Sequence, residues 1–214
     1  MKYLVATLSA LTLILCGLFL YSNSHKIIIR VGTDCSCRSC EKVICLELEE
    51  YVSRSLPAEW YPNWEKHSLM AGAVAVRTYA LYHKIHPINA EYDICDTECC
   101  QVLGSKSYNS TNQAVNETVG VILVDYTGKI AKPLYSSEAN ATGGCGDGFI
   151  RSTSGGQCLN DEVCLGAVPN GHGLGMCQWG SQRWALKDRS WVWILAHYYS
   201  SLRLQKVSNL DKLQ

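Results

Sequence analysis

The segment Leu69–Leu81 reads LMAGAVAVRTYAL and carries a single charge, at Arg77. Its apolar residues cover most sides of a helix, which is typical of a helix enclosed by other elements. Asn63 is a suitable N-cap for such a helix. We therefore predict a buried, alanine-rich helix from about residue 64 to residue 81 at the centre of the fold.

The elements around this helix are predicted from residue spacing and turn residues. They are a short strand at 26–31, a cysteine-dense loop at 35–45, a helix from residue 46 that Pro57 ends, a short helix at 113–118, a hairpin of 119–125 with 129–135, a loop-like segment at 143–175, and helical spacing over 178–199. Together they predict an α+β fold. Helices pack on a small antiparallel sheet, and a substrate groove lies between them.

Composition narrows the class of protein. The chain has 214 residues, with 19 basic and 19 acidic side chains. This length suits one ordinary domain or two small ones. Balanced charge argues against a nucleic-acid partner, because such proteins usually show a basic excess or stripe. With 17 glycines and 5 prolines, disorder and collagen-like repeats are also disfavoured.

The first residues have the character of a membrane segment. Leu4–Tyr21 contains no charge, and as a helix it would be about 27 Å long, close to the thickness of a hydrocarbon core. A signal peptide and an uncleaved anchor both fit, and the length of the run with no Ala-x-Ala site favours the anchor. We expect residues 1–24 to be this segment. Residues 25–214 would form one domain outside the cytoplasm, membrane-anchored or secreted, where disulfides persist.

Of the 12 cysteines, 11 remain when Cys16 is set aside with the membrane segment. An odd number cannot all pair within the chain. If Cys95, Cys99 and Cys100 bind a metal, the others are even in number and allow up to four disulfides. This parity argument assigns no connectivity. For the outer cysteine groups, at 35–45 and 145–177, disulfides that staple loops are favoured over additional metal sites.

Glu59 is the only acid in Ser55–Pro62, which reads SLPAEWYP. A carboxyl group packed among proline, alanine and tryptophan loses hydration, which raises its pKa and lets it hold a proton near neutral pH. The alternative is an exposed loop glutamate, or one paired with Arg77. Local composition alone favours that alternative.

Five blocks of sequence change this balance. They are 48–81 with PAEW at 57–60, CDTECCQ at 95–101, AVNETVGVIL at 114–123, GHGLGMCQWGS at 171–181 and WILAHYY at 193–199. In this order they resemble the stage II sporulation protein D (SpoIID) and amidase-enhancer family of cell-wall proteins. The resemblance covers residue 46 to about residue 204. Each block is weak by itself, but five in order are specific, and Glu59 matches the catalytic acid of the family.

The resemblance implies a lytic transglycosylase that cuts peptidoglycan between N-acetylmuramic acid and N-acetylglucosamine. Members of the sporulation type favour glycan strands stripped of their stem peptides. One carboxyl group can suffice, because attack by the sugar's own C6 hydroxyl needs no activated water, whereas most glycoside hydrolases use two. If a second acid takes part, Glu50, Asp96 and Glu98 are the candidates.

The resemblance also suggests where the substrate binds. His172 and Gln178 lie in a glycine-rich segment and offer hydrogen bonds to acetamido and hydroxyl groups. A tight turn whose histidine caps a helix is the alternative. Ser136 and Ser137 occupy the family's serine-rich strand end. The predicted substrate-binding residues are Arg77, Tyr79, Ser136, Ser137, His172 and Gln178.

The block around Cys95 allows two chemistries. The family usually has Cys-Asp-x-x-His-Cys here, and some members hold zinc; Cys99 stands where histidine is usual. Thiolate and imidazole are both good zinc ligands, so Cys95, Cys99 and Cys100 with His86 or His83 would complete a tetrahedron. Adjacent cysteines rarely bind one ion, and in an oxidising compartment a disulfide from Cys95 or Cys100 fits equally well. The sequence leaves both open.

Three functions follow from these observations. The first is a membrane-tethered lytic transglycosylase that remodels the bacterial wall, with a role in sporulation. The second is a non-catalytic glycan binder that activates a separate cell-wall amidase. The third is a muramidase that uses water, which would require a second carboxylate.

Overall fold

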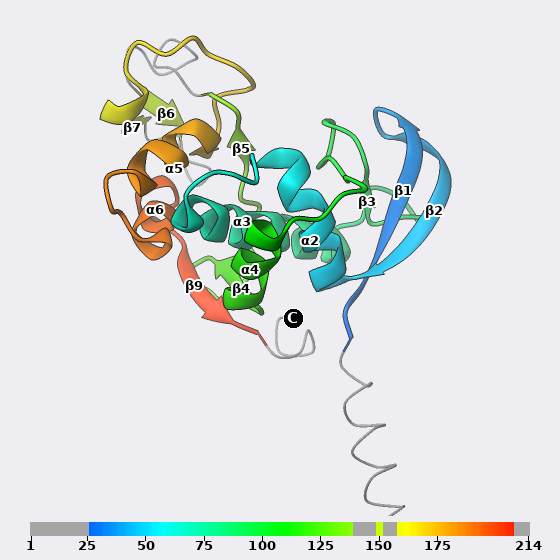
Figure 1. Ribbon diagram of the computed structural model, residues 1–214. Coiled ribbons are helices and arrows are strands. Elements are labelled where there is room, and N and C mark those ends of the chain that lie inside the picture. Colours follow the sequence, from blue (N-terminus) through cyan, green and yellow to red (C-terminus); the bar gives the residue numbers. More distant parts are fainter. Residues whose placement is uncertain (1–25, 139–148, 152–157, 208–214) are drawn as a thin grey trace, which may run out of the picture.

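The computed structural model describes residues 26–138, 149–151 and 158–207. Its centre is α3 (Lys66–Ile85), in which every residue from 68 to 81 is buried. Figure 1 shows α3 running through the middle of the molecule, and it contacts helices and strands on several sides. The predicted buried helix is confirmed. It begins at Lys66, shortly after a turn in which the Trp64 N–H donates to the Tyr61 carbonyl at 3.0 Å.

Four further helices surround α3. They are α2 (Leu48–Glu59), α4 (Asn109–Glu117), α5 (Gln178–Ala185) and α6 (Trp191–Tyr198). The predicted end of a helix at Pro57 is wrong, because α2 continues to Glu59. Pro57 costs one backbone hydrogen bond in the last turn, and the Trp60 N–H still closes that turn on the Leu56 carbonyl at 2.8 Å.

A long hairpin replaces the predicted cysteine-dense loop. β1 (Ile28–Ser36) and β2 (Ser39–Glu47) pair antiparallel, and β3 (Ile94–Cys95) joins β1 in parallel. In Figure 1 this hairpin forms one end of the molecule. β2 escaped prediction because most of its residues are exposed and its apolar and polar residues do not alternate regularly.

The predicted central hairpin does not form. β4 (Val121–Val124) pairs with β9 (Arg203–Lys206), and β5 (Tyr135–Ser136) pairs in parallel with β8 (Met176–Cys177). Only an isolated bridge joins Val124 to Ile130. β6 (Phe149–Arg151) pairs with β7 (Cys158–Asn160), which precedes the short helix η1 (Glu162–Cys164). The α+β class is therefore confirmed, but the β structure consists of several small sheets, whose partners are distant in the sequence.

The predicted N-terminal membrane segment lies outside the described residues. Within the ranges given above, no helix is both long and apolar enough to cross a membrane.

Candidate active site

A pocket of about 360 Å³ lies beside the C-terminal end of α2. The segment 98–102, strand β5 and the glycine-rich segment before α5 form its other walls. Six of the seven residues predicted to contact substrate or catalyse its cleavage line this one pocket. They are Glu59, Tyr79, Ser136, Ser137, His172 and Gln178.

Glu59 is the last residue of α2, and its side chain is mostly removed from water. The Val102 N–H donates to Oε1 at 2.7 Å. Burial raises the pKa of Glu59, and hydrogen bonds from Val102, Tyr135 and Gln178 reduce that rise. Among the described residues, no lysine, arginine or histidine forms an ion pair with it. The helix C-terminus also disfavours a negative charge, so this carboxyl group is suited to holding a proton.

A chain of buried side chains supports Glu59 from behind. The Tyr51 hydroxyl donates to Gln101 Oε1 at 2.9 Å, and Gln101 Nε2 donates to the Tyr135 hydroxyl at 2.8 Å. Because the Tyr135 oxygen already accepts that bond, its own proton is free for the Glu59 carboxylate. The sequence did not single out these three residues, since they are brought together only by the tertiary fold.

The serine and glycine segments meet at one wall. Gly175 has φ of +74°, and a Cβ there would lie 1.7 Å from the Leu134 carbonyl oxygen, so only glycine fits. This close approach brings β8 alongside β5 and its Ser136. Ser136 lines the pocket, and its Oγ is buried without a hydrogen-bond partner among the described residues.

His172 and Gln178 have different roles in this wall. The His172 Nδ1 accepts from the Leu174 N–H at 3.0 Å, and partial burial lowers the pKa of its ring. The neutral ring then carries its proton on Nε2. Gln178 lines the pocket, and its Nε2 donates to the Glu59 main-chain carbonyl at 2.7 Å. Gln178 thus fixes the end of α2.

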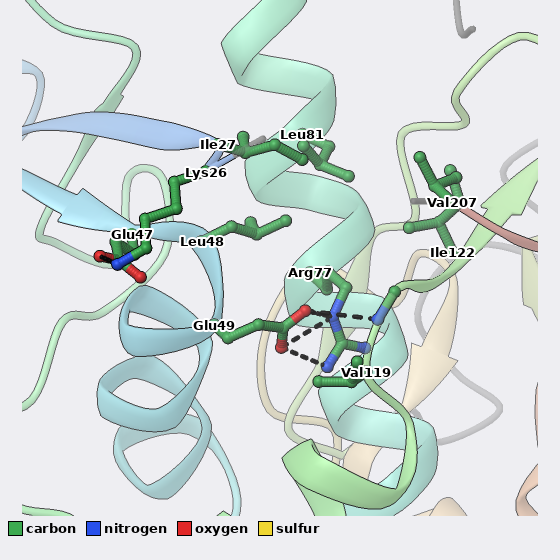
Figure 2. Close-up of a pocket in the computed structure, with 11 residues that line it drawn as sticks. Lys26, Ile27, Glu47, Leu48, Glu49, Arg77, Leu81, Val119, Ile122 and Val207 are labelled. Carbon is green, nitrogen blue, oxygen red and sulfur yellow. Dashed lines mark hydrogen bonds and ion pairs between the residues drawn. The ribbon is translucent and has the colours of Figure 1, made fainter. Parts of the chain in front are cut away.

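Arg77 is not part of this pocket, which corrects its predicted role in substrate binding. Its side chain is fully buried and donates to Glu49 from Nε and Nη2, both at 2.8 Å. Figure 2 shows Glu49 reaching from α2 to Arg77 on α3, beside a second pocket of about 310 Å³. Arg77 was misassigned because family resemblance does not show which face of a helix a residue occupies. Its pairing with Glu59 is not seen either.

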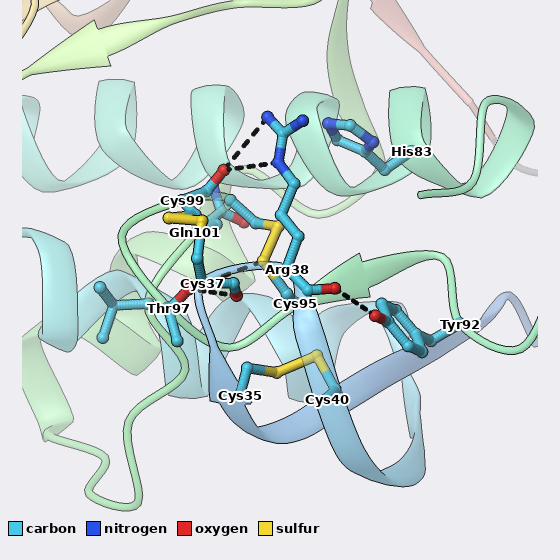
Figure 3. Close-up of a disulfide and its surroundings, with 12 residues drawn as sticks. Cys35, Cys37, Arg38, Cys40, His83, Tyr92, Cys95, Thr97, Cys99 and Gln101 are labelled. Carbon is cyan, nitrogen blue, oxygen red and sulfur yellow. Dashed lines mark hydrogen bonds between the residues drawn. A yellow bond between two sulfur atoms is a disulfide. The ribbon is translucent and has the colours of Figure 1, made fainter. Parts of the chain in front are cut away.

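The cysteines of the predicted zinc site are in disulfides instead. Cys95 is bonded to Cys100 and Cys99 to Cys37, and Cys35–Cys40 lies nearby (Figure 3). Disulfide sulfurs cannot act as thiolate ligands. His86 stacks on Tyr82 past the end of α3, and His83 packs on Tyr79. The predicted metal site is therefore not assembled here, and zinc binding by the reduced cysteines stays a prediction.

The pocket also contains residues that the sequence analysis did not assign to binding. Arg38, at the tip of the disulfide-bonded hairpin, and Lys132 bring positive charge to it. Glu98, one of the candidate second acids, lines it as well. No sequence signal placed Arg38 or Lys132 here, because both are exposed polar residues in segments far from Glu59.

The part of the chain that is similar to known proteins contributes some of the residues of this site. The model of the SpoIID family, "Stage II sporulation protein", matches residues 37–125. An uncharacterized protein of Brachyspira hyodysenteriae is 40% identical over 95 residues, which are 43% of this chain and 26% of that protein. The amidase enhancer of Bacillus subtilis is 36% identical over 83 residues, which are 38% of this chain and 11% of the enhancer.

The matched segment thus spans about a quarter of one relative and about a tenth of the other. Glu59, Tyr79 and the 98–102 wall lie inside the match, whereas the glycine-rich segment lies outside it. The resemblance seen in the sequence is confirmed: residues 37–125 of this chain match the model of the stage II sporulation protein D (SpoIID) family.

Proposed function

We propose that this protein is a lytic transglycosylase that cleaves the bond between N-acetylmuramic acid and N-acetylglucosamine in peptidoglycan. The observation that carries the proposal is the environment of Glu59. Its carboxyl group lies in a pocket, has a pKa raised by burial and has no ion-pair partner among the described residues. A group with these properties can deliver a proton and take one back.

In the proposed reaction Glu59 first protonates the glycosidic oxygen, and the bond from that oxygen to C1 breaks. The C6 hydroxyl of the muramic acid then attacks C1, and its proton passes to Glu59. The products are a free GlcNAc hydroxyl and a 1,6-anhydro ring, so the reaction requires neither water nor a second carboxylate. A positioned acid of this kind contributes about 10²- to 10⁴-fold to the rate.

The rest of the pocket suits a sugar substrate. Ser136 Oγ, His172 Nε2 and the Gln178 amide can bind hydroxyl and acetamido groups. The positive charges of Arg38 and Lys132 suit the lactyl carboxylate that muramic acid exposes when its stem peptide is absent. We therefore propose that the protein prefers denuded glycan strands.

The test is the chemistry of the product. Purified protein is incubated with denuded glycan strands, and the new ends are identified by mass spectrometry. Anhydro-muramic ends would support the proposal. Reducing ends would point to a muramidase that uses water, with Glu98 as the second acid. If the strands stay intact, the protein does not cleave them, and a non-catalytic function is indicated.

That non-catalytic function is activation of a cell-wall amidase, and it is supported by the name of the Bacillus subtilis relative, amidase enhancer. The same pocket would then bind glycan without cutting it. An amidase assay with and without this protein separates the two functions. An activator should work equally well with Glu59→Gln, whereas cleavage should not survive that change.

We further propose that the domain works outside the cytoplasm, held at the membrane by residues 1–24, and takes part in wall remodelling during sporulation. Three disulfides suit an oxidising compartment. Fractionation of cells followed by mass determination of the N-terminus would show whether the segment is retained, and recovery of the protein in the cytosol would contradict the proposal.

A further inference from the structure

A cluster of metal-binding side chains lies behind the wall of the pocket. Ligand atoms of Glu138, Cys164 and Cys177 lie within 4.8 Å of one another. These residues are only 8%, 2% and 0% exposed, respectively. They come from separate segments: Glu138 follows β5, Cys164 ends η1 and Cys177 ends β8. We propose that these three side chains bind one thiophilic divalent cation, zinc in particular, with the two sulfurs as thiolates.

The distance between the sulfurs favours a metal over a disulfide. Cys164 Sγ lies 3.3 Å from Cys177 Sγ. Two thiolates bound at about 2.3 Å to a tetrahedral zinc are about 3.8 Å apart, whereas a disulfide requires about 2.05 Å. The observed separation is thus closer to the metal geometry. Three other cysteine pairs in the same structure are already joined.

The surroundings of Cys164 are rich in acceptors. Its thiol donates to Asp161 Oδ2 at 3.2 Å, and Cys177 Sγ lies on its other side. A cation bound between these groups would replace the thiol protons and compensate the charge of the thiolates.

Arg183 holds the third ligand in place. It donates to both oxygens of Glu138 at 2.7 Å, from Nη1 and Nη2. Each carboxylate oxygen retains a lone pair, and Oε1 lies 3.6 Å from Cys177 Sγ. An outer partner that orients a ligand is the usual arrangement around bound metals. The charges of a divalent cation and the Arg183 guanidinium offset those of two thiolates and Glu138, and the nearby Asp161 carboxylate adds one further negative charge.

A cation bound at this site would hold the walls of the pocket in place and would not take part in the reaction. Ser136 and Ser137 directly precede Glu138, and Gln178 directly follows Cys177. β5 and β8 pair over only two residues each. A cation that joins both strands to η1 would therefore hold the serine wall and Gln178 in register with Glu59.

The test uses the full domain without reductant, so that the disulfides Cys35–Cys40, Cys37–Cys99 and Cys95–Cys100 stay intact. The protein is stripped with a chelator and titrated with Co²⁺. We expect one Co²⁺ per chain, thiolate-to-cobalt absorption in the near ultraviolet, and displacement by one Zn²⁺. Zinc at a hundredfold excess over its Kd should raise the Tm of the stripped protein by about 5–10 °C.

Variants assign the ligands. Cys164→Ser and Cys177→Ser should each abolish the absorption, and Glu138→Gln should weaken binding. Cys45→Ser, at an exposed cysteine, is the matched control and should leave the signal unchanged. If the serine variants do not fold, the wild-type titration still decides.

Absence of the thiolate–cobalt band in the wild type, with mass spectrometry showing Cys164 joined to Cys177, would overturn the proposal in favour of a disulfide. An unchanged band in the folded serine variants would overturn it as well. Neither readout requires glycan cleavage, so the metal site and the proposed enzymatic function can fail independently.

Discussion

Two glutamates of the same helix have opposite surroundings. Glu49 lies in the first turn of α2 and Glu59 is its last residue. Glu49 is 36% exposed and pairs with the fully buried Arg77, while Glu59 faces a pocket with no cation bonded to it among the described residues. The helix dipole also favours a negative charge at the first position and disfavours it at the second.

The difference separates a glutamate with a structural role from one that, in the proposed function, transfers a proton. The charge of Glu49 is useful because it neutralises a guanidinium that also donates to the carbonyls of Val115 and Val121. In the proposed function the useful state of Glu59 is the protonated one, and burial favours it, since no cation pairs with this carboxyl group among the described residues. Four predictions test this contrast, in order of decreasing effect.

The largest effect is expected at Glu59. Glu59→Gln should lower the rate of anhydro-end formation by about 10²- to 10⁴-fold, because the amide cannot transfer a proton. Turnover is measured on denuded strands by mass spectrometry, with circular dichroism to confirm folding. Glu49→Gln is the matched control and should retain turnover in the folded fraction. Equal losses in both variants would remove the functional distinction between the two positions.

Removal of Arg77 should act on stability. Arg77→Met leaves Glu49 without its partner and frees several carbonyls, so the free energy of unfolding should fall by about 3 kcal/mol, measured by urea denaturation. Arg203→Met, at an exposed arginine, is the comparison and should change it by less than about 0.5 kcal/mol. A similar small change at Arg77 would contradict a structural role for the pair.

Tyr135 should tune Glu59 without replacing it. Tyr135→Phe removes a hydrogen bond that favours the carboxylate, so the pKa of Glu59 should rise further. The alkaline limb of the pH–rate profile should then move to higher pH, with a loss of about tenfold at the optimum. A uniform drop at every pH would indicate a packing defect in place of the proposed positioning role.

The smallest effect concerns stability as a function of pH. The pKa of Glu59 is higher in the folded protein than in the unfolded chain. Its stabilising contribution is therefore complete below the unfolded pKa and is lost as pH rises through the folded pKa. Compared with wild type, Glu59→Gln should lose less stability over that interval, as measured by Tm at successive pH values. Parallel curves would show that this carboxyl group is not perturbed.

The sequence predicted many of the residues that line the pocket around Glu59 and little of the sheet structure. The sequence of Leu69–Leu81 identified the central helix, because a helix that is apolar on all sides is stable only when it is buried in the core. Strand pairs such as β4 with β9 join residues far apart in the chain, and each strand is too short for a periodic signal. The predicted hairpin at 119–135 relied on sequence neighbours and was wrong for that reason.

What the sequence determined by itself is the candidate acid, Glu59, and the resemblance to the SpoIID family, because matching blocks in order constrain residue types at fixed places. Only the tertiary structure decided which polar residues face that acid. It placed Arg77 with Glu49, joined the cysteines around 95–100 as disulfides, and brought Tyr135 and Gln101 behind Glu59. The orientation and pairing of these side chains depend on contacts between segments that are far apart in the chain. The order of residues in the sequence does not specify those contacts.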